Sequence, residues 1–85
     1  PIYYRELADS YCMSGQTNLC LKNASQAIKI NPQNLLTLKA LAKTFIRTGM
    51  WENAQIMVEK IATLSPTDEE GRQLQRYIQE KRLNR

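Results

Sequence analysis

Apolar residues in the first part of the chain recur with the spacing of a helix. Tyr4, Leu7, Ala8 and Tyr11 stand at i, i+3, i+4 and i+7, so they line one face of an α-helix. Gly15 follows them, and glycine allows the backbone conformation with which helices commonly end. The pattern predicts a first helix that ends near Gly15, where the chain reverses direction.

A second apolar face follows this turn. Cys20, Ala24, Ala27 and Ile28 lie on one side of a helix predicted over residues 18–30, and most of these side chains are small enough for a neighbouring helix to approach closely. Pro32 ends this helix, because proline has no amide hydrogen and disfavours helical backbone at the residue before it. The first part of the chain is therefore expected to form a helical hairpin.

The same arrangement returns at a constant interval along the chain, so that Gly49 corresponds to Gly15 and Pro66 to Pro32. The apolar positions of the second copy are Leu38, Leu41, Ala42 and Phe45 before the turn, and Trp51, Ala54, Met57, Val58 and Ile61 after it. A hairpin with one apolar face cannot bury that face alone, and stacking a second hairpin on it solves the problem. No stretch shows the alternation typical of a β-strand.

The segment after Pro66 predicts a fifth helix of a different character. Thr67 and Glu70 have the spacing of a capping box, which marks a helix N-terminus. Polar and charged residues cover most of this helix, and its narrow apolar stripe consists of Leu74, Tyr77 and Ile78. Such a helix can close a stack of repeats, because its outer side needs no cover.

The sequence therefore predicts an all-α protein of tandem helix-turn-helix repeats with a C-terminal capping helix. The first repeat covers residues 1–34, the second residues 35–68 and the capping helix residues 69–83. We expect a single domain, because 85 residues can form one small hydrophobic core but not two.

This order of residues resembles the tetratricopeptide repeat family, whose unit has about 34 residues. The family's order is filled first by Tyr4, Leu7, Ala8, Tyr11, Gly15, Cys20, Ala24, Ala27 and Pro32, and again by Leu38, Leu41, Ala42, Phe45, Gly49, Ala54, Val58, Ile61 and Pro66. Ile61 departs from the family's alanine, and we expect it to hold the second pair of helices slightly further apart. The resemblance implies a right-handed superhelix with a concave groove in which segments of partner proteins bind.

Composition agrees with a folded, soluble domain, with 42% apolar and 24% charged residues. No apolar run approaches the roughly 20 residues that cross a bilayer, so we expect no membrane segment. Because the chain begins at Pro1 rather than methionine, we expect it to be a fragment of a longer protein.

Two cysteines, Cys12 and Cys20, are too few and too irregularly placed for a disulfide framework, and no CxxC or histidine accompanies them. We interpret both as buried small apolar residues. This interpretation favours a reducing compartment, and we predict a cytoplasmic protein.

Positive charge is concentrated in the first half of the chain. The net charge is +4, and residues 1–47 hold six basic residues against two acidic ones. Three of the six, Lys39, Lys43 and Arg47, stand at i, i+4 and i+8 and form a row of cations along one helical face, here called the basic ladder.

Two interpretations of the basic ladder are open. In the first it is a solvated face whose charge is relieved by Asp9 or Glu6 on the neighbouring helix. In the second it works with Arg5 to receive an acidic peptide segment, a terminal carboxylate or a phosphate.

The family resemblance also implies which residues face the groove, because the first helix of each pair lines it. The candidate partner-binding residues are Arg5, Asp9, Lys39, Lys43, Arg47 and Tyr77. Further residues expected to face the groove are Ile2, Glu6, Cys12, Met13, Leu36, Ala40, Ile46, Gln73 and Leu74.

We predict a protein–protein interaction scaffold or adaptor without catalytic activity, cofactor or metal. The sequence has no histidine and no phosphate-binding loop, and the expected partner is a protein or peptide, acidic or with a free carboxylate. One alternative is a homodimer through the uncapped first helix, where Ile2 and Tyr3 would be exposed. Nucleic-acid binding through the basic half is a weaker alternative, because Tyr4, Tyr11 and Phe45 belong to the expected core and cannot stack on bases.

Overall fold

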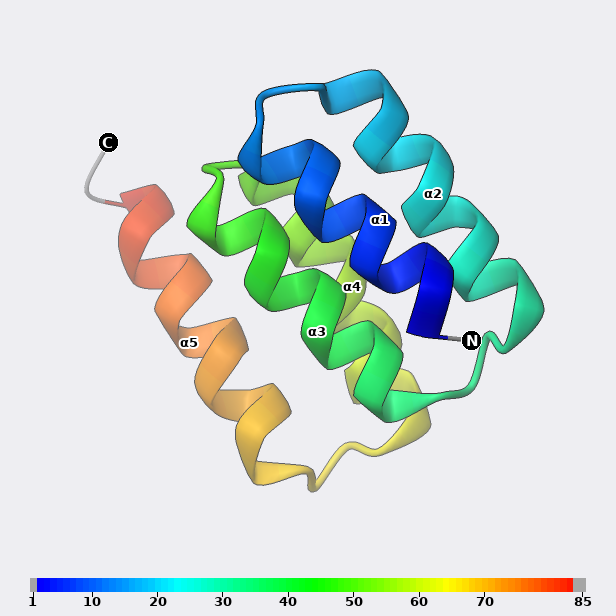
Figure 1. Ribbon diagram of the computed structural model, residues 1–85. Coiled ribbons are helices and arrows are strands. Elements are labelled where there is room, and N and C mark those ends of the chain that lie inside the picture. Colours follow the sequence, from blue (N-terminus) through cyan, green and yellow to red (C-terminus); the bar gives the residue numbers. More distant parts are fainter. Residues whose placement is uncertain (1, 84–85) are drawn as a thin grey trace.

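Five α-helices make up most of residues 2–83, the part of the chain described by the computed structural model (Figure 1). They are α1 (Ile2–Met13), α2 (Thr17–Ile30), α3 (Leu35–Arg47), α4 (Trp51–Leu64) and α5 (Glu69–Leu83). No strand occurs within residues 2–83, so the all-α prediction is confirmed for them.

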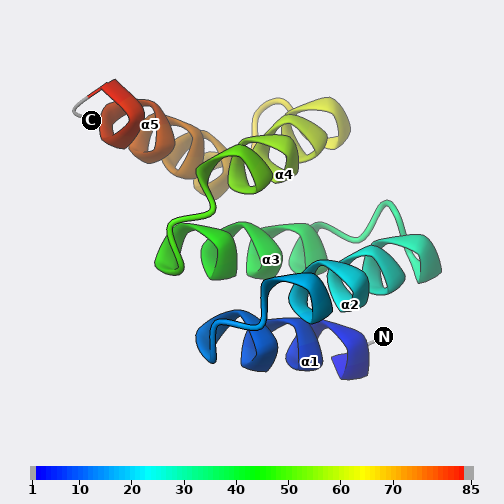
Figure 2. The ribbon, with the colours of Figure 1, turned by 90° about the horizontal axis from the view of Figure 1, so that it is seen from above.

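Helices α1, α3 and α5 follow one another across the molecule, with α2 packed on α1 and α4 packed on α3 (Figures 1 and 2). Helix α3 occupies the middle and packs against each of the other four helices. Its buried apolar residues are Leu38, Leu41, Ala42 and Phe45, none of which is more than 1% exposed. The core of the molecule is therefore centred on α3.

The turns inside the two hairpins have the same backbone structure. Gly15 and Gly49 have positive φ angles of 81° and 75°, which glycine adopts without the steric cost that a side chain would bring. In the second turn Gly49 N donates to Ile46 O and Met50 N donates to Phe45 O, and the first turn has the same two bonds at the corresponding positions. These are the two hydrogen bonds of the Schellman motif, which ends a helix by satisfying its last carbonyl groups.

The connections after the two hairpins also correspond, because each places a capping side chain at the same position of its repeat. Asn34 Oδ1 accepts a hydrogen bond from Thr37 N at 3.2 Å, and Asp68 Oδ2 accepts one from Gly71 N at 2.8 Å. Both side chains cap the helix that follows. The structure is thus repeat-like in its turns as well as in its helices.

The capping residue of α5 differs from the sequence-based prediction. Asp68, not Thr67, occupies the N-cap position, because its backbone oxygen accepts the first helical hydrogen bond, from Arg72 N. Glu70 does not fold back onto the cap as a capping box requires, and its carboxylate is paired with lysines of α3.

The packing of α5 on α4 depends on one large and one small residue. A Cβ atom on Gly71 would lie 2.7 Å from Cγ2 of Ile61, closer than packed atoms approach, so the absence of a side chain at Gly71 makes room for Ile61. The corresponding positions one repeat earlier are the buried Ala27 and Thr37. The contact between α2 and α3 thus has a small residue on the first helix and a larger one on the second, and the contact between α4 and α5 has the reverse. The space for the Ile61 side chain comes from the missing side chain of Gly71 in α5.

Cys12 and Cys20 form a disulfide between α1 and α2, which corrects the interpretation of the two as simple apolar residues. Both are buried as expected, with exposures of 6% and 0%. They lie at equal distances in sequence from Gln16, on opposite arms of the hairpin, and their Cα atoms are 5.0 Å apart. Closing so short a loop contributes about 2–3 kcal/mol in the chain-entropy model.

This disulfide bears on the predicted compartment. Disulfides persist in oxidising environments and are rare where thiols are kept reduced, so the prediction of a reducing compartment loses the ground on which it was made. Within residues 2–83 no helix combines the length and the apolar character needed to cross a membrane.

The pair of Ile61 and Gly71 can be tested by exchanging its sizes. Ile61→Ala alone should lower the free energy of unfolding by about 2–5 kcal/mol, and Gly71→Thr alone by about 1–3 kcal/mol, because one leaves a cavity and the other a clash. The double variant recreates the Ala27 and Thr37 pair, so its loss should fall short of the sum by at least about 0.5 kcal/mol. Chemical denaturation measures all three.

Gln73→Thr, at an exposed position of α5, is the control for the effect of threonine on the helix itself. If the losses of the two single variants simply add in the double variant, Ile61 and Gly71 do not share space in the way described.

Candidate functional site

A groove of about 580 Å³ runs along one side of α1 and α3 and ends at α5. Its lining residues are Arg5, Glu6, Asp9, Ser10, Leu36, Lys39, Ala40, Lys43, Thr44, Arg47 and Glu70. We call it the charged groove, because four cations and three anions lie in its wall.

Five of the six candidate partner-binding residues lie in the charged groove, namely Arg5, Asp9, Lys39, Lys43 and Arg47. Tyr77 does not line it. The centroid of the Tyr77 ring lies 6.4 Å from that of Trp51, so Tyr77 packs against the start of α4. Lys81 Nζ lies over the Tyr77 ring, 5.4 Å from its centroid.

The first cation of the basic ladder is paired with two carboxylates at the start of α5, one on the capping residue and one in the first turn. Lys39 Nζ lies 2.8 Å from Asp68 Oδ1 and 3.6 Å from Glu70 Oε1. The side chains of Lys39 and Asp68 are only 15% and 19% exposed, so water screens this pair less than it screens a surface pair. Since Asp68 also caps α5, one carboxylate fixes both the start of that helix and its attachment to α3.

The second cation is paired more openly. Lys43 Nζ lies 2.5 Å from Glu70 Oε2, and the two side chains are 51% and 43% exposed. An ion pair at this exposure contributes about 0–1 kcal/mol, because solvent screens the attraction and ordering both side chains costs entropy. The pair of Lys43 and Glu70 can therefore open at little cost.

The third cation is paired with α1. Arg47 forms an ion pair with Asp9, and the same carboxylate oxygen accepts a hydrogen bond of 2.7 Å from Thr44 Oγ1. Thr44 is buried, and its Oγ1 also lies 3.1 Å from Ala40 O. Asp9 is thus held from two positions of α3, and the arrangement links the two helices across the groove.

These contacts shift the pKa values of Asp68, Glu70 and Lys39. The hydrogen bond from Lys39, followed by that from Gly71 N, holds the pKa of Asp68 below its ordinary value of 3.8. The hydrogen bond from Lys43 holds the pKa of Glu70 below 4.5. The hydrogen bond to Asp68 raises the pKa of Lys39 above 10.5.

The structure has features that each of the two interpretations of the basic ladder requires. Asp9 does relieve one cation, as the first interpretation expected, but the two lysines are paired with α5 rather than with α1. Lys43 and Arg47 remain about half exposed, so an incoming carboxylate can reach them. Arg5 lines the groove and makes no ion pair with any residue of the described chain.

Thr44 and Glu70 were not predicted as groove residues, and Asp68 was not predicted as the partner of Lys39. Glu70 and Asp68 had a signal, since two acids at the start of the closing helix lie near whichever helix that start packs against. Thr44 had none, because a hydroxyl one turn from a cation is common on any helix.

Within residues 2–83 no three side chains of the metal-ligating types lie together in a group that could bind a metal ion. The carboxylates of Asp9 and Glu70 are occupied by arginine, threonine and lysine side chains instead.

Comparison with family models, with curated proteins and with solved structures gave no match in any of the three. The resemblance to the tetratricopeptide repeat therefore stays a prediction from the spacing of residues.

The ties between α3 and α5 predict a loss of stability in acid. The pKa values of Asp68 and Glu70 are lower in the folded chain than in the unfolded one, so the unfolded chain takes up protons first as the pH falls. Stability is complete above these ordinary values and declines below about pH 4.5. Asp68→Asn keeps a capping side chain but cannot titrate, so its thermal midpoint should fall less between about pH 6 and about pH 3.

Glu69→Gln is the matched control, because it removes an exposed carboxylate of the same turn that makes no ion pair within the described chain. A melting midpoint of Asp68→Asn that declines as steeply as that of the unaltered chain would remove the Lys39 tie from the account.

Proposed function

We propose that this chain is a protein-interaction module, and that its charged groove receives an acidic segment of a partner protein. The observation that carries the proposal concerns Lys43 and Arg47. Both side chains are about half exposed, and each is held in place by an ion pair with a carboxylate that a partner's carboxylate can replace. The spacing of residues that resembles the tetratricopeptide repeat supports the same function.

Exchange is inexpensive because of where the two cations lie. A partner carboxylate that replaces Glu70 on Lys43, or Asp9 on Arg47, exchanges one screened ion pair for another. Arginine can bind such a carboxylate through two parallel hydrogen bonds, whereas lysine acts as a point charge. Asp9 and Glu70 then act as internal competitors that hold the groove closed to weak anions.

The three ladder cations have different roles in this proposal. Lys39 is mostly buried against Asp68 and belongs to the scaffold. Lys43 and Arg47 bind the partner, and Arg5 adds a cation from α1 at the far wall of the groove. Leu36, which is 72% exposed in the same groove, offers an apolar contact beside these charges.

The proposal predicts opposite effects for two pairs of substitutions. On an array of acidic and free-carboxylate peptides, Lys43→Ala with Arg47→Ala should weaken binding by roughly tenfold, since each exposed ion pair contributes up to about a factor of five. Asp9→Asn with Glu70→Gln should instead strengthen binding severalfold, because the internal competitors are gone. Affinities of the best peptides are then measured in solution by fluorescence anisotropy.

Lys22→Ala with Arg82→Ala removes the same number of charges outside the groove and serves as the control. A purely structural role for the ladder predicts another result. In that case Asp9→Asn with Glu70→Gln lowers the melting midpoint without raising the affinity for any acidic peptide, and the proposed function is wrong.

A further inference from the structure

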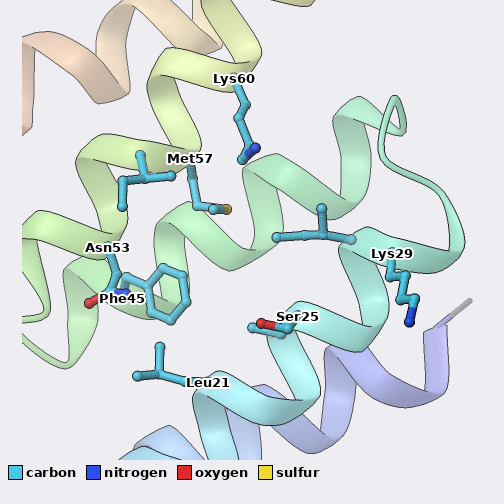
Figure 3. Close-up of a pocket in the computed structure, with 10 residues that line it drawn as sticks. Leu21, Ser25, Lys29, Phe45, Asn53, Met57 and Lys60 are labelled. Atoms are coloured by element: carbon cyan, nitrogen blue, oxygen red, sulfur yellow. The ribbon is translucent and has the colours of Figure 1, made fainter.

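A second groove lies between α2 and α4 (Figure 3) and shares no lining residue with the charged groove. No Cα atom of α2 comes within 8 Å of a Cα atom of α4, so the two helices leave a channel between them whose floor is α3. The channel has a volume of about 370 Å³. We call it the apolar groove.

The floor and walls of the apolar groove are hydrophobic. Leu21 from α2, Phe45 from α3 and Met57 from α4 point toward one another across it (Figure 3). Ile56 adds an apolar side chain that is 47% exposed, more than a core residue would be. Phe45 and Met57 are themselves buried, at 1% and 5% exposure. The apolar surface left for a partner is therefore that of Ile56 and of the half-buried Leu21.

Charge at the rim of the apolar groove has one sign. Lys29 on α2 and Lys60 on α4 line it, and no acidic residue does. Neither lysine makes an ion pair with another residue in 2–83. This is the reverse of the charged groove, where each cation of the ladder is already neutralised.

Apolar walls between two unpaired cations suit one kind of occupant. We infer that the apolar groove docks an amphipathic, acidic segment of a partner protein, with a large apolar side chain against Leu21 and Ile56 and carboxylates at Lys29 and Lys60. An apolar face laid into a hydrophobic groove is a recurrent mode of peptide recognition. Unpaired lysines at the rim select acidic segments over neutral ones and speed their association.

A protein segment fits better than the other occupants. The groove is at the small end of the roughly 300–1,000 Å³ that ligand pockets occupy and is open along its length, so a small molecule would stay largely in water, whereas a protein segment brings surface to cover it. A second copy of this chain carries the same net charge of +4 and is repelled from a basic rim.

The test uses two synthetic amphipathic helical peptides, one with glutamates beside its leucines and one with glutamines in their place. Nuclear magnetic resonance of the ¹⁵N-labelled chain should show shifts at Ser25, Asn53 and Ile56 with the acidic peptide, and affinity at least severalfold lower for the neutral one. Lys29→Glu with Lys60→Glu should weaken binding of the acidic peptide by at least roughly tenfold, because two attractions become repulsions.

Two controls separate this site from charge in general and from the charged groove. Lys22→Glu with Arg82→Glu reverses the same number of exposed charges elsewhere and should change affinity less than about twofold. Lys43→Ala with Arg47→Ala should leave the shifts at Ser25 and Asn53 unchanged, so failure of the proposed function does not decide this one. Ile56→Ser should weaken both peptides, since it removes an exposed apolar wall.

Three outcomes would overturn the inference. The first is that neither peptide causes shifts around the apolar groove up to about millimolar concentration. The second is that Lys29→Glu with Lys60→Glu leaves the affinity for the acidic peptide unchanged. The third is that the free chain self-associates and that those substitutions abolish the self-association. The last would assign the groove to a second copy.

Discussion

Burial of helix α3 is the constraint on which the rest of the structure depends. It is the only helix in the described chain that packs against all the others, and Leu38, Leu41 and Phe45 are almost completely removed from water. Burying a large apolar side chain contributes about 1.5–3 kcal/mol, so these three residues outweigh all the exposed ion pairs of the molecule together. The first hairpin, α1 and α2, buries its apolar face against α3, and α4 buries its own against α3 as well.

The same central position gives the molecule two different grooves. One side of α3 faces the charged groove, where its cations meet carboxylates from α1 and α5. Phe45 reaches the other side and forms the floor of the apolar groove, where the lysines of α2 and α4 have no partner within the described chain. Ion pairs thus tie α3 to its neighbours in the charged groove, whereas Lys29 and Lys60 at the apolar groove form none within the described chain.

The fold could be predicted from sequence as far as local rules decide it. Apolar spacing located the helices, and Gly15 and Gly49 located the turns, because only glycine adopts their backbone angles without cost. The disulfide was missed, because Cys12 was expected to face the groove, whereas its side chain is buried against Cys20 of α2. The fit of Ile61 against Gly71 was missed because the two belong to different helices.

Prediction of the site reached the cations but not their partners. The spacing of Lys39, Lys43 and Arg47 put them on one helical face, yet the carboxylates that hold the lysines belong to the start of α5, beyond the whole of α4 in the sequence. Tyr77 was expected to face the groove, because the family resemblance implied that the closing helix continues the row of groove-lining helices. In the structure its ring is instead drawn toward Trp51, an aromatic contact that no sequence spacing specifies.

Native-state hydrogen exchange across a denaturant series tests the central role of α3 most directly. Because α3 cannot leave either hairpin without exposing its buried residues, the slowest amides of α1, α3 and α4 should converge on one free energy of opening as denaturant increases. Exchange of α1 and α2 as a separate unit, at a clearly lower free energy while α3 and α4 stay protected, would contradict the account.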